Sequence, residues 1–203
     1  RSMKRFHDVA EFVRNQGLGR LERIDVTIPP NNRFASATWS PEPVPAALDW
    51  DLWLGPSPWR PYTSAGCHYN FRFIADNAYG QITNWGAHYL DIGQWALDMD
   101  ASGPVSVEGH GHFPTSGLFT NATYIDFTCK YANGVTMIVK SGGPNRFEGT
   151  DGWIELEGGK AEPESLLTER SEAHKIQLYQ SNDHHGNFID CVKSRRPTAA
   201  PVE

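Results

Sequence analysis

Three polar residues that could take part in proton transfer lie close together in the sequence: Asn84, His88 and Asp91. Spacings of four and three residues place all three side chains on one face of a helix. A histidine in such a cluster can act as a general acid or base near neutral pH, and a nearby carboxylate can fix its tautomer. The same spacing also suits a purely structural His-Asp pair that ties a helix to a loop. The pattern thus predicts a polar cluster that has either a chemical or a structural role.

A second group of polar residues follows a tryptophan-rich stretch and has the chemistry of sugar recognition. Arg60, His68, Asn70 and Arg72 bring hydrogen-bonding groups next to flat aromatic side chains, a mixture that suits polyhydroxylated ligands. The alternative is that the tryptophans close the end of a sheet while the arginines bind backbone carbonyls.

Metal and nucleotide sites have little support in the sequence. His110 and His112 alternate along an expected strand and share one side of it, but two ligands without a third and fourth indicate a polar surface stripe. The chain contains neither G-x-G-x-x-G between a strand and a helix nor G-x-x-x-x-G-K-[ST]. We therefore expect no metal and no cofactor-binding residues in this chain.

Composition narrows the classes of partner. The 203 residues carry a formal net charge of -6 and no polybasic segment, which argues against nucleic acid and anionic lipid. No apolar run is long enough to cross a membrane. The three separated cysteines, Cys67, Cys129 and Cys191, fit neither a disulfide framework nor a zinc site. They predict reduced core residues and a cytoplasmic location, while an export signal on a longer parent protein would lie outside these residues.

The first part of the chain predicts two helices and a strand around an irregular segment. Apolar residues at helical spacing from Phe6 to Val13 predict a short helix, and alternation over Leu21–Ile28 predicts a half-buried strand. Residues 29–66 carry eight prolines among several tryptophans, which predicts an ordered excursion rather than a linker. The helical pattern returns over Thr83–Leu97.

The second part predicts a sheet. Period-two patterns occur at Val105 and Val107 and over Tyr124–Tyr131, Val135–Lys140 and Trp153–Glu157, and Asn133-Gly134 marks a hairpin of type I′. A last helix, Asn187–Lys193, is expected to bury Ile189 and Val192.

Because the strands gather after the helices, we expect a single α+β domain over residues 1–203, with helices on one face of a large, mainly antiparallel open sheet. The open face is expected to be apolar enough to require a second subunit, which predicts a homodimer or higher homo-oligomer.

Six segments, in order along almost the whole chain, resemble the C-terminal domain of the Gfo/Idh/MocA oxidoreductases. They are Leu48–Pro56 (LDWDLWLGP), Cys67–Phe73 (CHYNFRF), Asn84–Ile92 (NWGAHYLDI), Tyr131–Val135 (YANGV), Phe147–Ile154 (FEGTDGWI) and Asn187–Ser194 (NFIDCVKS).

The resemblance implies a two-domain enzyme in which an N-terminal Rossmann domain binds NAD or NADP and the C-terminal domain holds a sugar or polyol. This chain resembles the second part only, without the family's glycine-rich fingerprint, its Glu-Lys-Pro motif or its final helix. We therefore expect a parent NAD(P)-dependent sugar dehydrogenase, and expect the 203 residues alone to be inactive as a dehydrogenase.

The resemblance also assigns site residues. His88 matches the family's catalytic histidine, Asn84 stands where an aspartate is usual, and Asp91 is the expected orienter of His88. An amide can orient a hydroxyl but cannot accept a proton as a carboxylate does. Arg72, Asn70 and Trp85 are expected to help hold the sugar.

Two further hypotheses of different classes stay open at this point. The chain could be a stand-alone module, either a carbohydrate-binding oligomer or a glycoside hydrolase of the same fold. It could also be a catalytically silent scaffold whose open sheet forms dimers.

Overall fold

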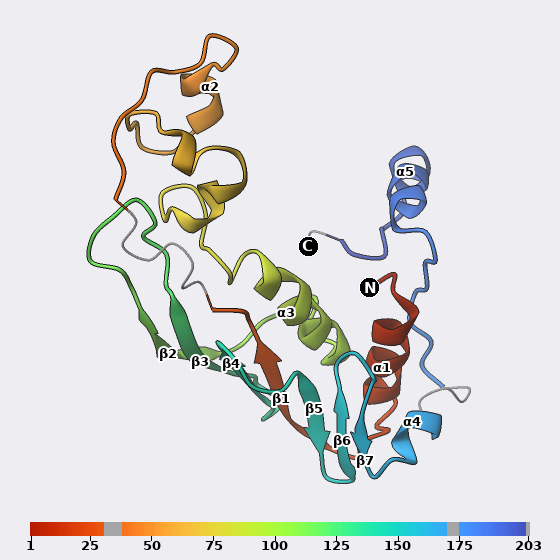
Figure 1. Cartoon of the computed structure of the whole chain (residues 1–203). Helices are drawn as coiled ribbons and strands as arrows, with labels where there is room; N and C mark the ends of the chain where they lie inside the picture. The colour runs from red at the N-terminus through yellow and green to blue at the C-terminus, as the bar shows by residue number, and fades with distance from the viewer. Residues whose placement is uncertain (31–37, 170–174, 202–203) are drawn as a thin grey trace.

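The computed structural model describes residues 1–30, 38–169 and 175–201. Figure 1 shows a curved sheet with α1 and α3 against one face, an excursion that projects from one end of it, and α5 standing apart. The α-helices are α1 (Lys4–Arg14), α2 (Trp50–Leu54), α3 (Trp85–Ala96), α4 (Leu166–Glu169) and α5 (His184–Ser194), with 3-10 helices η1 (Ser64–Gly66) and η2 (His68–Phe73). The strands are β1 (Leu21–Thr27), β2 (Ser106–His112), β3 (Tyr124–Lys130), β4 (Thr136–Lys140), β5 (Arg146–Gly149), β6 (Gly152–Glu155) and β7 (Ala161–Glu162).

The seven strands form one sheet in the order β2-β3-β4-β1-β5-β6-β7. Five of the neighbouring pairs are antiparallel, and only β1 and β4 run parallel. The expected α+β class and mainly antiparallel open sheet are thus confirmed. The short strands β5 and β7 did not emerge from the sequence pattern.

The hairpin between β3 and β4 has a different turn from the one predicted. Tyr131 N donates to Val135 O at 3.0 Å, and Gly134 N donates back to Tyr131 O at 3.0 Å. Gly134 has φ 88° while Asn133 is not in the positive-φ region, so the type I′ turn is wrong. The connection is a three-residue loop whose last residue is a left-handed glycine, a common alternative for antiparallel strands.

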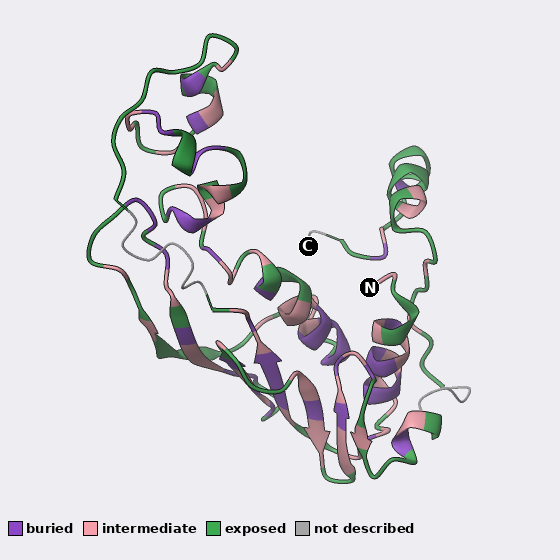
Figure 2. Ribbon diagram, viewed as in Figure 1, coloured by how far each residue is buried: buried purple, intermediate pink, exposed green. Residues whose placement is uncertain are grey.

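The main core lies between the sheet and helices α1 and α3, both of which were predicted. Figure 2 shows the buried residues along the facing sides of α1, α3 and the strands. Helix α3 approaches the sheet closely because it carries glycine at two contact positions. A Cβ at Gly86 would lie 2.8 Å from Ile28 Cδ1, and one at Gly93 would lie 2.6 Å from Met137 Cε. The sheet thereby fixes the position of α3.

The opposite face of the sheet is polar, which corrects the expectation of a large apolar area. Asp25 on β1 is only 4% exposed and is held by Arg23 Nη2 at 2.6 Å and Arg146 Nε at 3.4 Å. Asp126 on β3 pairs with Lys140 Nζ at 3.4 Å. The period-two alternation placed apolar residues on the core side of the strands, but the expectation that the open side is also apolar is wrong, because charged pairs occupy it.

The tryptophan-rich excursion contains a small core of its own. Trp50, Leu54, Tyr62 and Cys67 are buried together, and the rings of Trp50 and Trp53 stack at 4.8 Å. The described part of the excursion is therefore ordered by aromatic packing, as expected. Residues 31–37 of the predicted excursion lie outside the described residues.

Helix α5 confirms the predicted last helix but not its core contacts. Ile189 and Val192 are 49% and 48% exposed, whereas Cys191 is 8% exposed. The expected burial of Ile189 and Val192 is wrong, because an apolar stripe shows which side of a helix is hydrophobic but not what covers it. All three cysteines are free and buried, as predicted.

Candidate functional site

The N-terminal end of α3 meets η2 through a hydrogen bond between two predicted site residues. Arg72 Nη1 donates to Asn84 Oδ1 at 3.1 Å, and Asn84 Nδ2 donates to Gln81 Oε1 at 3.0 Å. The Arg72 guanidinium also lies over the Tyr69 ring at 3.9 Å and donates from Nε to Tyr69 O at 2.9 Å. Its position is therefore fixed from two sides, by an aromatic face and by an amide.

Trp85 and His88 extend this cluster along the first turn of α3. Trp85 is 46% exposed and stacks on Tyr89 with ring centroids 6.4 Å apart and planes at 15°. His88 is exposed, and its ring meets Trp85 edge-on at 6.4 Å. Within the described residues His88 has no hydrogen-bond partner. Its imidazole nitrogens are therefore accessible to a ligand.

Asp91 has a different partner from the one expected. Arg1 Nη2 donates to Asp91 Oδ1 at 2.7 Å, and Arg1 Nη1 donates to Asp100 Oδ2 at 2.8 Å. Burial alone would lower the pKa of Arg1, but the hydrogen bonds and charges of the two carboxylates raise it above its usual range. The orienting contact between Asp91 and His88 is not formed, so Asp91 acts here as a structural anchor for α1 and α3.

Two other predicted sugar ligands lie apart from this cluster. Asn70 Nδ2 donates to Ala65 O at 2.9 Å and so closes the loop before η2. Arg60 belongs to the excursion: its Nη1 donates to Asn77 Oδ1 at 2.9 Å, and its guanidinium lies 5.5 Å from the Trp50 ring centre. Burial lowers the pKa of Arg60. Both residues thus make contacts within the protein, but the contact of Arg60 is with a side-chain amide and not with the backbone carbonyl that the alternative interpretation named.

Residues that hold Arg72 in place were not found from the sequence. Asn121 is 5% exposed, and its Nδ2 donates to Arg72 O at 3.0 Å and to Ala78 O at 2.9 Å. Gly80 N donates to the same Arg72 carbonyl at 2.9 Å, and Gly80 has φ 62°. Asn121 follows no motif, but an asparagine in the loop before a strand often binds backbone groups.

The second histidine pair lies elsewhere, on β2 at the edge of the sheet. His112 Nδ1 is 3.0 Å from Thr123 Oγ1. Within residues 1–30, 38–169 and 175–201, no group of three or more His, Cys, Asp or Glu is arranged to hold a metal ion.

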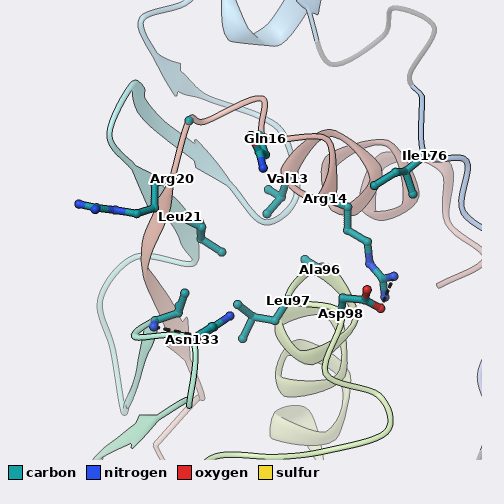
Figure 3. Close-up of a pocket in the computed structure, with 12 residues that line it drawn as sticks. Val13, Arg14, Gln16, Arg20, Leu21, Ala96, Leu97, Asp98, Asn133 and Ile176 are labelled. Carbon is teal, nitrogen blue, oxygen red and sulfur yellow. Dashed lines mark hydrogen bonds and ion pairs between the residues drawn. The ribbon is translucent and has the colours of Figure 1, made fainter.

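The cavity drawn in Figure 3 lies at the other end of α3 and contains none of the predicted site residues. It has a volume of about 400 Å³, and Arg14, Leu97 and Asp98 contribute to its wall. Arg14 already pairs with Asp98 there. The face that carries Trp85 and His88 is instead open to solvent.

The described topology does not fit a dinucleotide. Such a cofactor binds at the carboxyl ends of parallel strands, where a glycine-rich turn opens a helix. The one parallel pair, β1 and β4, is not followed by such a turn: β1 leads into Pro29-Pro30, and β4 into Gly142-Gly143 and β5. We therefore derive no chemical step through a cofactor held by this chain.

The fold matches the C-terminal α/β domain of an oxidoreductase family. A family model described as "Oxidoreductase family, C-terminal alpha/beta domain" matches residues 33–201. The chain therefore belongs to the Gfo/Idh/MocA oxidoreductase family, as the sequence resemblance implied. No curated protein matches it.

Two solved structures share this fold at low sequence identity. The WlbA dehydrogenase from Bordetella pertussis, in complex with NADH and UDP-GlcNAcA, has a TM-score of 0.51 and 12% identity, with 94% of this chain and 50% of that chain covered. The aldose-aldose oxidoreductase from Caulobacter crescentus, complexed with glycerol, has a TM-score of 0.50 and 15% identity, with 98% and 52% covered. The chain spans about half the length of these structures. No helix in the described residues is long and apolar enough to cross a membrane.

Proposed function

We propose that this chain is the substrate-binding domain of a nicotinamide-dependent sugar or polyol oxidoreductase. The observation that carries the proposal is the cluster at the start of α3. There, Arg72, Asn84, Trp85 and His88 present a guanidinium, an amide, an indole and an imidazole around one helical turn. Hydrogen-bonding groups beside an aromatic face are the combination that a polyhydroxylated ligand requires.

Each residue of the cluster has a distinct part in binding. Arg72 and Asn84 orient hydroxyl groups, while the exposed Trp85 packs against the apolar face of the sugar. His88 accepts the proton of the hydroxyl that is oxidised, because in the described part of the chain its ring is exposed and its nitrogens have no hydrogen-bond partner. Asp91 contributes by holding α3 against α1 through Arg1.

The hydride acceptor would be a nicotinamide held by another part of a longer protein. The two structural neighbours, each about twice as long as this chain, support that division: one is complexed with NADH and a nucleotide sugar, the other with glycerol. In this proposal the cofactor domain faces the solvent-exposed side of the cluster, where Trp85 and His88 lie, and brings the nicotinamide next to the bound sugar.

We also propose that the polar open face of the sheet contacts a second copy of the chain. Ile138 is an apolar residue in the middle of this face, between Asp25 and Thr128 in the strand register. Such an interface would be wet and rich in charge pairs rather than a continuation of the core.

Calorimetry on the 203-residue chain tests the proposed function. Sorbitol and glucose should bind with dissociation constants on the order of 1 mM, as suits small ligands of a half-open site. Arg72→Ala should abolish this binding, whereas Arg20→Ala, which removes an exposed arginine from the opposite end of the domain, should preserve it. NAD, NADP and their reduced forms should give no heat of binding. Micromolar binding of any of them would contradict the proposal that another part of a longer protein holds the cofactor.

A further inference from the structure

Strand β2 is an open edge of the sheet. It is the first strand in the order β2-β3-β4-β1-β5-β6-β7, and among the described residues it pairs with β3 alone. Six of its seven residues are exposed. One row of its backbone N–H and C=O groups therefore lacks a strand partner, and such a row is a template for another strand.

The edge lacks the features that usually prevent pairing. Proteins block edge strands with proline, with lysine or by making the strand very short. The opposite edge, β7, has only two residues. Strand β2 has seven residues, with neither proline nor lysine among them. The structure thus protects one edge of the sheet and leaves the other available.

Apolar side chains follow the same edge. Val105, Val107 and Phe113 are 69%, 62% and 59% exposed. Val107 shares one side of β2 with Gly109 and Gly111, and Val105 and Phe113 flank the strand at its two ends. Val107 and Phe113 also border an apolar groove of about 390 Å³. Three large exposed apolar residues along one edge form a surface that a partner strand would cover.

The sequence of β2 complements itself when two copies run antiparallel about a twofold axis through Gly109. On the polar side, this register places Glu108 opposite His110 of the other copy, and repeats the pair by symmetry. On the apolar side it places Val105 opposite Phe113 and Val107 opposite Gly111. Each carboxylate meets an imidazole, and each large apolar residue faces an apolar partner or a glycine.

The centre of this register is a glycine for a reason internal to each copy. A Cβ at Gly109 would lie 2.3 Å from Asp126 O on β3, so β2 and β3 approach closely there. His110 lies opposite Asp126 in the same pair of strands, and the Asp126 carboxylate pairs with Lys140 Nζ at 3.4 Å. Glu108 and His110 are the exposed polar residues on either side of Gly109.

We infer that a second copy of this chain pairs its β2 with β2 of the first, antiparallel about Gly109, and joins the two sheets edge to edge. This contact is distinct from the proposed contact through the open face, and goes beyond the proposed function. Backbone hydrogen bonds provide the affinity, and the Glu108–His110 pairs select the register.

Sedimentation equilibrium of the chain tests this pairing in an Ile138→Lys background, which removes the contact through the open face. This variant should still form dimers. Adding Val107→Lys should raise the dimer dissociation constant at least tenfold, because an outward lysine blocks an edge.

A charge exchange tests the register itself. His110→Glu should weaken the dimer about tenfold by placing two carboxylates opposite one another, and Glu108→Lys should weaken it similarly by removing the carboxylate that faces the imidazole. The double variant, which places lysine opposite glutamate, should return to within about threefold of the starting value. Glu108 and His110 are exposed in each copy, so the circular dichroism spectra of the three charge variants should match that of the starting protein. The proposal is overturned if the Ile138→Lys variant is monomeric at about 100 μM. It is also overturned if the Glu108→Lys, His110→Glu double variant dimerises no more tightly than the two single variants.

Discussion

Arg72 Nη1 lies 3.1 Å from Asn84 Oδ1, and this hydrogen bond joins η2 to the N-cap residue of α3. The two segments carry the aromatic and polar side chains of the proposed site, so the bond sets their relative position. The Asn84 amide oxygen accepts this hydrogen bond from the Arg72 guanidinium, and a carboxylate in its place would form a stronger bond.

Asn84→Asp should therefore stabilise the chain by about 0.5–1 kcal/mol at pH 7, because the new carboxylate forms a charge-assisted bond with Arg72. The Gln81 amide can turn to donate to it. The Arg72 charge should lower the pKa of the new aspartate, so the gain should be present above about pH 4 and be lost as the pH falls further. Urea unfolding at pH 7 and at about pH 3 measures the difference; an equal gain at both values would show that the ion pair is not its source.

Removing Asp91 should affect stability rather than sugar binding. Asp91→Asn leaves the nearly buried Arg1 side chain with Asp100 alone, which should cost about 1–2 kcal/mol, since the aspartate itself is 38% exposed. Asp190→Asn on the exposed part of α5 is the matched control and should be neutral. Denaturant unfolding and sugar calorimetry on both variants separate a role in stability from a role in sugar binding. Loss of sugar binding with unchanged stability would show that Asp91 belongs to the binding site.

Tyr131 should make the chain sensitive to alkali. Burial, with a smaller contribution from Cys129, raises the pKa of Tyr131 to about 12, while its hydroxyl donates to Gln94 Oε1 at 2.7 Å. An unfolded tyrosine ionises near pH 10, so the stabilisation is complete below about pH 10 and is lost as the pH rises toward 12. The loss should be on the order of 2 kcal/mol. Tyr131→Phe should be less stable at pH 8 by about 1 kcal/mol and should lack this share of the alkaline loss. If the stability of the wild-type chain and of Tyr131→Phe falls in parallel between about pH 10 and pH 12, Tyr131 is not the source of the alkaline loss.

Close packing of α3 on the sheet should make Gly93 intolerant of a branched side chain. Gly93→Val would push against Met137 and should destabilise the chain by about 2 kcal/mol. Ala87→Val on the exposed side of the same helix is the control and should change stability by less than about 0.5 kcal/mol. Thermal unfolding of the two variants measures this, and equal melting temperatures would show that the helix can move away from the sheet without cost.

Regular periodicity made most of the fold predictable. The pattern over Thr83–Leu97 placed α3 within two residues of its ends, and alternation over Leu21–Ile28 placed β1. Strand β5 has four residues, of which only Phe147 is fully buried, so its pattern is too short to be distinguished from a turn.

The contacts of the site were less predictable because they join distant parts of the chain. Arg1 pairs with Asp91 across 90 positions, and Asn121 binds the Arg72 carbonyl across 49. Helical spacing shows that Asp91 can reach His88, but it does not show that Arg1 binds the Asp91 carboxylate instead. The resemblance identified the cluster, and packing decided which members are available to a ligand.

The most direct test of the proposed binding site is an NMR titration of the isotope-labelled chain with sorbitol and, separately, with NADH. Sorbitol should shift the Trp85 indole signal, the His88 ring signals and the backbone amides around Asn84, while NADH should shift none of them. Sorbitol shifts confined to the cavity at Leu97, or an NADH titration that saturates on this chain, would contradict the proposal that the start of α3 is the polyol site of a domain that leaves the cofactor to another part of the protein.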